Sequence, residues 1–364
     1  MSVSSKKIIT RRITINLCMV LVLLLPISSV PGAENENSAS KPAKLFKTDE
    51  AISVTISAPW RDIERKEEYQ GTYPGKIEFT DELGNATSLN MTVERRGRTR
   101  QAVCRFPPIK LRFDKAEVKG TSFRGQESLK MVTHCQKSSR YEQLYVMEML
   151  VYRMYNIMTD FSFRVRPLSV TYVDSEHGDR QGPRFAFLIE DDSDVAKRNG
   201  QKKLKIPKAA KKQLDSSVTT NFTLFQYMIS NLDWSAISGP DKGKCCHNAK
   251  LIGQDPEKDP VYPIPYDFDA AGLINAPYAS PPAKLPVRTV TQRLYRGFCA
   301  HNDTIEDSRQ RFLSNEQAIM AVVRDEPLLN SNTSKKALKF LDKFFDTLKD
   351  DQDFQKKIIE KCRK

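Results

Sequence analysis

The chain has 364 residues, and its 58 lysine and arginine residues against 45 aspartate and glutamate residues give a formal net charge of +13. This length is enough to bury one large core or two lobes. The positive charge favours acidic partners such as phosphates, teichoic-type polymers or anionic membrane surfaces. We expect no nucleic-acid partner, because there is no nucleic-acid motif and no basic stripe interleaved with aromatic residues.

Residues 1–33 have the three parts of a secretion signal. Basic residues come first, an apolar stretch follows at 13–30, and small residues lead up to Ala33. Two prolines interrupt the apolar stretch, whereas a membrane-spanning helix needs about 20 apolar residues. We therefore expect a cleaved signal peptide rather than an anchor. The protein would be exported, periplasmic or extracellular, with no stable membrane span after removal of the signal.

Six cysteines follow the predicted signal: Cys104, Cys135, Cys245, Cys246, Cys299 and Cys362. An even number in an exported protein predicts disulfide bonds, although the sequence leaves their pairing open. Zinc is the alternative, because histidines lie beside several of these cysteines. No C-x2-C spacing presents two thiolates to one ion, so disulfides are the preferred interpretation.

The polar composition of residues 34–48 predicts a flexible tether. Residues 49–190 are strand-rich, with alternating apolar and polar residues at 52–56, 75–79, 89–93 and 109–113 and further predicted strands at 128–133, 168–173 and 184–190. One major helix interrupts them at 141–158, where apolar residues recur at helical spacing.

Residues 191–215 are predicted to be a basic connecting loop. The run from Lys197 to Lys212 contains no acidic residue. Such runs are usually solvated loops. The alternative is an arm that contacts an anionic surface or a phosphate-rich substrate. Residues 216–364 are mainly helical, with amphipathic segments at 219–232, 305–323, 334–349 and 352–362.

Polar residues gather in three short segments of the C-terminal half: Asn231-Leu-Asp233-Trp234, His247-Asn248 and Pro265-Tyr-Asp267-Phe-Asp269. Asp267 and Asp269 are two positions apart, so on a strand they point the same way. Two such carboxylates repel unless a cation lies between them, and their oxygens suit Mg²⁺. We expect a metal-phosphate site completed by Asp233 and Asn248. Turn and helix-cap chemistry is the alternative explanation.

The order of these parts resembles the kinases like spore-coat protein H, the CotH-like family. The resemblance runs from about Val93 to Gly272. It rests on Arg96-Gly97, on the segments around Lys110 and Lys130, on Phe185-Ala-Phe-Leu-Ile-Glu190 and on the three polar segments. It implies an α+β, two-lobed protein-kinase-like architecture, with a strand-rich N-lobe at 49–190 and a mainly helical C-lobe at 216–364.

The resemblance also implies roles for individual residues. Asp233 would be the acidic residue of the catalytic loop, and Mg²⁺ would be held by Asp267, Asn248 and Asp269. ATP would bind through Lys110 or Lys130, the helix residues Glu142 or Glu148, Glu190 and Arg96. Together these parts could position a nucleotide for phosphoryl transfer.

The function implied is that of an exported atypical kinase, which transfers a phosphoryl group from a Mg-nucleotide to a hydroxyl of a protein or envelope component. Two alternatives remain. One is a non-catalytic kinase-like envelope protein that binds an anionic ligand. The other is a structural, disulfide-stabilised exported protein.

Overall fold

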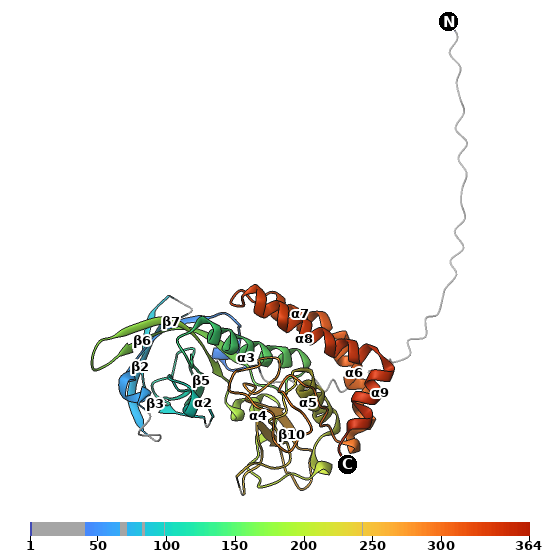
Figure 1. The fold of residues 1–364 in the computed structure, drawn as a ribbon. Coiled ribbons are helices and arrows are strands. Elements are labelled where there is room, and N and C mark those ends of the chain that lie inside the picture. The colour runs from blue at the N-terminus through green and yellow to red at the C-terminus, as the bar shows by residue number, and fades with distance from the viewer. Residues whose placement is uncertain (2–40, 66–70, 82–83, 98, 242) are drawn as a thin grey trace. The chain divides into compact units, whose positions relative to one another are not determined.

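The computed structural model describes residues 1, 41–65, 71–81, 84–97, 99–241 and 243–364. From residue 41 onward these residues belong to one compact unit (Figure 1). The predicted signal peptide, apart from Met1, and the first residues of the predicted tether lie outside the described ranges. Within those ranges, no helix combines the length and the apolar character needed to cross a membrane.

Seven strands form a closed barrel in the order β1-β2-β3-β4-β5-β7-β6. Neighbouring strands are antiparallel, except that β1 and β6 run in parallel and close the barrel, with Ile52 opposite Leu168. The strands are β1 (Ile52–Ala58), β2 (Thr72–Thr80), β3 (Ala86–Arg95), β4 (Ile109–Arg112), β5 (Ser128–Val132), β6 (Val165–Asp174) and β7 (Arg180–Ile189).

Alternating residues of these strands fill the barrel interior, because successive side chains of a strand point to opposite faces. Ile56, Ile77, Val93, Leu111 and Leu129 are all fully buried and share one core. The alternation in the sequence therefore has its physical cause in the barrel. Each predicted strand segment overlaps one of the seven barrel strands.

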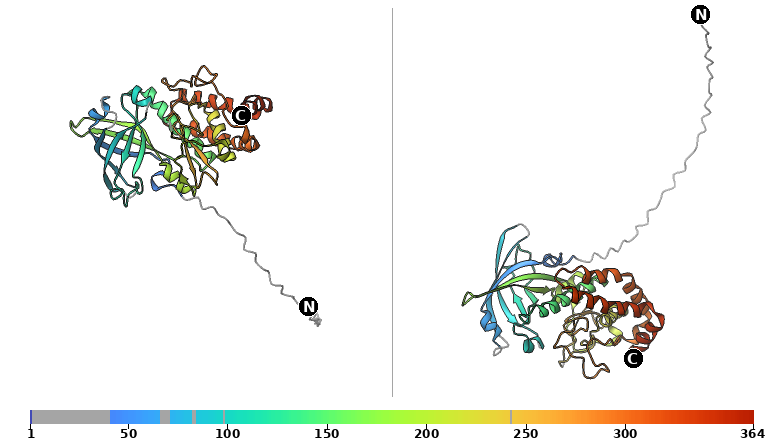
Figure 2. Two further views of the ribbon diagram at one scale, coloured as in Figure 1. Left: turned by 90° about the horizontal axis from the view of Figure 1, so that it is seen from below. Right: turned by 45° about the horizontal axis from the view of Figure 1, so that its top comes forward.

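Helix α3 (Ser139–Met158) packs against barrel strands β6 and β7 and also against helix α7 (Glu316–Arg324) (Figures 1 and 2). The hydroxyl of Ser138 caps its first turn by accepting a hydrogen bond from the backbone N–H of Arg140. The helix is buried along most of its length, because it carries apolar residues on more than one face. This central position brings Glu148 to the candidate site.

The remaining elements are a small second sheet and the other helices. The three-stranded sheet has the order β10-β9-β8, with β8 at Lys202–Lys203, β9 at Ala249–Gly253 and β10 at Tyr262–Pro265. The other α-helices are α1 (Trp60–Glu64), α2 (Thr99–Val103), α4 (Asp192–Arg198), α5 (Ser216–Met228), α6 (Ile305–Ser314), α8 (Ser331–Lys349) and α9 (Asp351–Lys357). The 3-10 helices are η1 (Lys44–Phe46), η2 (Lys211–Gln213), η3 (Cys299–Thr304) and η4 (Ile359–Lys361).

The expected two-lobed protein-kinase-like architecture is wrong. The chain forms a closed, mixed seven-stranded barrel with helices, rather than a strand-rich N-lobe and a helical C-lobe. The barrel is closed by the parallel pairing of β1 with β6, two strands far apart in the sequence. Alternation predicts each strand and its inward face, but it does not identify the strand's partner.

Two segments expected to lack regular structure contain short elements. In the predicted tether, 34–48, Leu45 and Phe46 of η1 are buried in the barrel core. The predicted loop at 191–215 contains α4, β8 and η2. Asp191 caps α4 by accepting a hydrogen bond from the backbone N–H of Ser193 at 3.0 Å. Within the basic run, the backbone N–H groups of Leu204 and Ala209 donate to the carbonyl oxygens of Leu251 and Ile237, each at 3.0 Å, which fixes the run to the rest of the molecule.

Candidate functional site

A pocket of about 390 Å³ lies between the segments that follow β3 and β10, the ends of β5 and β7, helix α3 and the chain from 233 to the start of β9. Its lining includes six of the residues that the sequence singled out: Arg96, Glu148, Asp233, Asn248, Asp267 and Asp269. These residues come from separate parts of the chain. The fold therefore brings together the polar segments that the motifs identified.

Asp267 and Asp269 form a carboxylate wall just after β10. Asp267 has a left-handed backbone, with φ of +61°, and its backbone N–H donates to the hydroxyl of Tyr152 at 3.0 Å. Burial and the nearby charge of Asp269 raise the pKa of Asp267 to about 6. This wall thus has excess negative charge that a cation would relieve.

Arg100 neutralises part of this wall. Its Nε donates to Asp269 Oδ2 at 3.0 Å and to the hydroxyl of Tyr278 at 3.1 Å, and its guanidinium forms an ion pair with Glu148. Arg100 and Glu148 are almost completely buried, with 7% and 1% exposure. Burial raises the pKa of Glu148 to about 7, although the charge of Arg100 opposes the shift.

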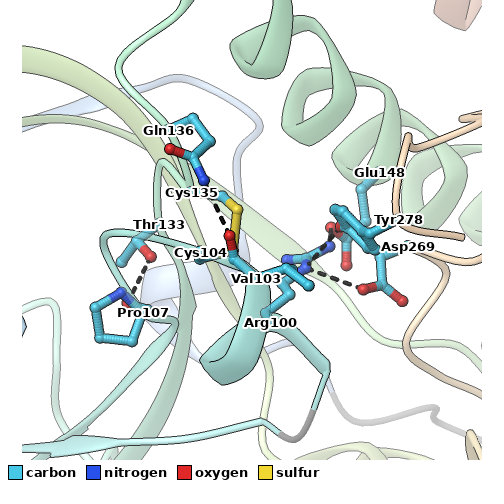
Figure 3. The surroundings of a disulfide bond; sticks show 10 residues. All are labelled: Arg100, Val103, Cys104, Pro107, Thr133, Cys135, Gln136, Glu148, Asp269 and Tyr278. Atoms are coloured by element: carbon cyan, nitrogen blue, oxygen red, sulfur yellow. Dashed lines mark hydrogen bonds and ion pairs between the residues drawn. A yellow bond between two sulfur atoms is a disulfide. The ribbon is translucent and has the colours of Figure 1, made fainter. Parts of the chain in front are cut away.

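A disulfide lies directly behind Arg100. Helix α2 carries Arg100 and ends at Val103, and Cys104 is bonded to Cys135, four residues before helix α3 begins. Figure 3 shows the side chain of Arg100 extending from α2 away from this bond and toward Glu148, Asp269 and Tyr278. The disulfide therefore ties the segment that supplies Arg100 to the segment that leads into α3.

Asp233, His247 and Asn248 form a second hydrogen-bonded group in the pocket. His247 Nε2 lies 2.7 Å from Asp233 Oδ1. The amide nitrogen of Asn248 donates to Asp233 Oδ2 at 3.0 Å and to its backbone oxygen at 2.7 Å. Asn248 also has a left-handed backbone, with φ of +46°. The side chain of Asp233 is 41% exposed, so a ligand can reach it.

A cationic group surrounds Tyr266, and of its members Arg96 and Lys250 line the pocket. The ammonium nitrogens of Lys130 and Lys250 lie 4.9 and 5.2 Å from the centroid of the Tyr266 ring, and Arg96 donates to its hydroxyl. Burial lowers the pKa of Lys130 to about 8, an effect that Lys250 and Arg96 reinforce and Asp192 opposes. An anion between these cations would offset their repulsion.

Four of the expected site residues are not among the described residues that line the pocket: Lys110, Lys130, Glu142 and Glu190. Lys130 nevertheless contacts Tyr266, which does line it. The ammonium of Lys110 lies 3.8 Å from Glu94, although its position on β4 is opposite Lys130 on β5. Glu142 is in the first turn of α3. Glu190 is fully buried and accepts a hydrogen bond from Arg198 at 3.1 Å.

Sequence reasoning did not assign roles to Lys250 and Tyr266, and it did not predict the contacts of Arg100 with Glu148 and Asp269. Arg100 lies in a five-residue helix, which is too short to give a periodic signal. Lys250 had a usable signal, because it lies two positions after Asn248 on a strand and such positions share a face.

The predicted disulfides are confirmed as cysteine pairs at bonding distance: Cys104–Cys135, Cys245–Cys246 and Cys299–Cys362. Zinc is not favoured, because all six cysteines are paired. Among the described residues, no group of three or more histidine, cysteine, aspartate or glutamate side chains forms a metal site. The adjacent pair Cys245–Cys246 lines the pocket next to His247.

The chain matches no family model, and neither a curated protein nor a solved structure matches it significantly. The resemblance to CotH-like kinases therefore rests on the sequence motifs alone.

Proposed function

We propose that this pocket binds a magnesium nucleotide and transfers its terminal phosphoryl group to a hydroxyl of a protein or envelope component. One observation carries the proposal: the carboxylate wall lines a single pocket of about 390 Å³ together with Arg96 and Lys250 of the cationic group. Phosphoryl transfer needs both signs of charge, because the metal is held by carboxylates and the phosphate oxygens by cations. The volume lies within the usual range for small-molecule sites, about 300–1,000 Å³.

The chemistry of the donor set suits Mg²⁺. Asp267 and Asp269 supply carboxylate oxygens, and burial, followed by the nearby charge of Asp269, raises the pKa of Asp267. Asn248 points its amide nitrogen at Asp233, and no described residue donates a hydrogen bond to its Oδ1. Asp267, Asp269 and Asn248 would hold the ion, which would neutralise phosphate charge when bound.

The cationic group suits the phosphates of a nucleotide. Lys130, Lys250 and Arg96 surround Tyr266, and each can donate hydrogen bonds to phosphate oxygens. The main nearby anion for both lysines is Asp192, which already accepts from Lys203 at 2.7 Å. Positive charge therefore remains for a ligand.

Asp233 is placed to act on the acceptor hydroxyl. Its Oδ1 faces His247 at 2.7 Å and its Oδ2 faces Asn248 at 3.0 Å, so both neighbours fix the orientation of the carboxylate. It would orient the hydroxyl and accept its proton as the phosphoryl group is transferred. Positioning of this kind supplies much of the rate in phosphoryl transfer.

A second candidate is an anion-binding protein without turnover. One observation favours it: Glu148 is paired with Arg100, so this glutamate does not take the nucleotide-binding role that the motif resemblance implies. Such a protein would bind phosphate-containing ligands through Lys130 and Lys250 with or without Mg²⁺. The binding protein and the phosphotransferase therefore differ in their dependence on Asp267.

The test is thermal unfolding of the protein with and without ATP and Mg²⁺, followed by an assay for transfer of labelled phosphate from ATP. Asp267→Asn removes one charge and keeps the side-chain shape. Asp342→Asn, on the exposed face of α8, is the matched control. Ligand at about 100 times its Kd should stabilise the wild type and the control by about 2.7 kcal/mol.

We expect the Mg²⁺-dependent part of this stabilisation to be lost in Asp267→Asn. Stabilisation by ATP that is independent of both Mg²⁺ and Asp267 would favour the binding protein over the phosphotransferase. The proposal is wrong if ATP stabilises neither the wild type nor the control while both are folded.

A further inference from the structure

Part of the basic run is an ordered edge of the pocket rather than a free loop. Leu204, Ile206 and Ala209 pack into a hydrophobic cluster that also contains Trp234 and residues of the pocket's outer loop. Between them, Lys205 and Lys208 are exposed. Burial of the alternate apolar residues thus fixes which way these lysines face.

Two backbone hydrogen bonds attach this segment to the loop that borders the pocket. The N–H of Cys245 donates to the carbonyl oxygen of Ile206 at 3.1 Å, and the N–H of Ala209 donates to that of Ile237 at 3.0 Å. Lys205 and Lys208 are the chain neighbours of these bonded positions. They therefore lie beside the loop that carries Lys244.

Lys244 lines the pocket itself and is exposed. We call Lys205, Lys208 and Lys244 the basic rim. None of the three forms an ion pair with a residue that the structure describes. Asp241 is the acidic residue of the same loop that lines the pocket, so the rim keeps a net positive charge.

We infer that the basic rim binds an acidic peptide segment that flanks the hydroxyl to be phosphorylated. The inference rests on the proposed function, since it names the class of acceptor for the same pocket. Carboxylates on either side of an acceptor hydroxyl would meet Lys205, Lys208 and Lys244 while the hydroxyl reaches Asp233. Complementary charge of this kind gives specificity and faster association.

The structure favours a peptide over a membrane surface. Surfaces that bind membranes combine basic residues with exposed apolar side chains that enter the lipid. Among the described residues, the exposed large apolar side chains are Met1, Val103 and Leu328, and none belongs to the rim or to its supporting loop. The rim thus offers charge without an apolar anchor.

Fluorescence anisotropy of a labelled peptide tests the inference. The probe is a serine flanked on each side by four glutamates, and the comparison peptide has glutamines in their place. The rim variant is Lys205→Glu/Lys208→Glu/Lys244→Glu. The control is Lys335→Glu/Lys336→Glu/Lys339→Glu on α8, which changes the net charge equally on a helix that supplies no residue to the pocket.

We expect the wild type to bind the glutamate peptide more tightly than the glutamine peptide, with affinity that falls as salt rises. The rim variant should bind it about tenfold more weakly, and the control variant within about twofold of the wild type. Equal losses in the two variants, or equal affinity for the two peptides, would overturn the inference. So would rim-dependent binding to phosphatidylserine vesicles without binding of the peptide.

The same samples separate this inference from the proposed function. A second variant, Lys205→Glu/Lys208→Glu, should retain its thermal stabilisation by ATP and Mg²⁺, because neither of these two lysines lines the pocket, whereas Lys244 does. A normal response to ATP with no rim effect on the peptide would refute the acidic acceptor alone. A missing response to ATP in the wild type would refute the phosphotransferase, whatever the peptide does.

Discussion

Arg100 Nε lies 3.0 Å from Asp269 Oδ2, and the same guanidinium pairs with Glu148 on helix α3. One buried cation therefore links the carboxylate wall after β10 to the central helix. Buried ion pairs contribute little net stability compared with apolar packing, but breaking one leaves an uncompensated charge. Arg100 is thus a residue on which both the shape of the site and its electrostatics depend.

Replacement of Arg100 should destabilise the whole fold. Arg100→Met would leave Glu148 buried without its partner, so we expect the free energy of unfolding to fall by about 3–5 kcal/mol in urea denaturation. Arg100→Met/Glu148→Met removes both charges and should recover much of this loss. A loss below about 1 kcal/mol for the single variant would mean that the pair is not buried as described.

The Cys104–Cys135 bond should stabilise the fold far more than the adjacent pair Cys245–Cys246. The first bond joins cysteines 31 positions apart, and closing a loop of that size in the unfolded chain corresponds to about 3–4 kcal/mol. The second joins neighbouring residues and restricts the unfolded chain little. We expect urea denaturation to show the larger loss for Cys104→Ser/Cys135→Ser, with Cys245→Ser/Cys246→Ser as the matched control. Equal losses would contradict this.

Stability should fall in acid because of His134. This side chain is stacked on Phe106, with 4.3 Å between ring centroids, and burial lowers its pKa from 6.5 to about 4. The unfolded state therefore binds more protons between these two pH values, so the contribution is complete above pH 6.5 and is lost as the pH falls toward 4. The full effect is at most about 3 kcal/mol.

His134→Phe keeps a ring of similar size and cannot be protonated. We expect its free energy of unfolding to vary less between pH 7 and pH 4.5 than that of the wild type, by up to roughly 3 kcal/mol. Denaturant titrations of both proteins at the two pH values make the comparison. The same pH dependence in both proteins would show that other groups cause it.

Lys130 should react unusually fast with amine-directed reagents. With a pKa of about 8, about half of its amines are neutral at pH 8, against less than about 1% for an ordinary lysine. Mass spectrometry after brief labelling should detect modified Lys130 before modified Lys335, which is exposed. ATP should slow the labelling of Lys130 and leave that of Lys335 unchanged. Equal rates at the two lysines would contradict the cationic group as described.

Local patterns in the sequence predict much of the candidate site. Asp233, Asn248 and Asp267 were singled out because each lies in a short polar segment, and all three line one pocket. Each of the three lies close to the end of a helix or strand, after α5, before β9 and after β10. Local patterns in a sequence can mark such ends. The contacts of Arg100 with Glu148 and Asp269 could not be predicted this way, because they join positions far apart in the chain.

The architecture was harder to predict than its elements. The alternation around Ile109 and Leu111 correctly gives a strand with one buried face. Closure of the barrel depends on which two edge strands pair with each other. Both β1 and β6 alternate apolar and polar residues in the same way. Their parallel pairing leaves no mark in either strand, so the sequence is equally compatible with an open sheet and with a barrel.

Closure through β1 and β6 also sets an order of events during synthesis. A chain that emerges N-terminus first presents β1 early, and β2 can pair with it at once as a hairpin. The other edge of β1 stays unpaired until residues 168–174 have been made. Until then the nascent chain carries an exposed strand edge, which is where wrong partners attach. A chaperone that shields Ile52–Ala58 would therefore act in the interval between the two pairings.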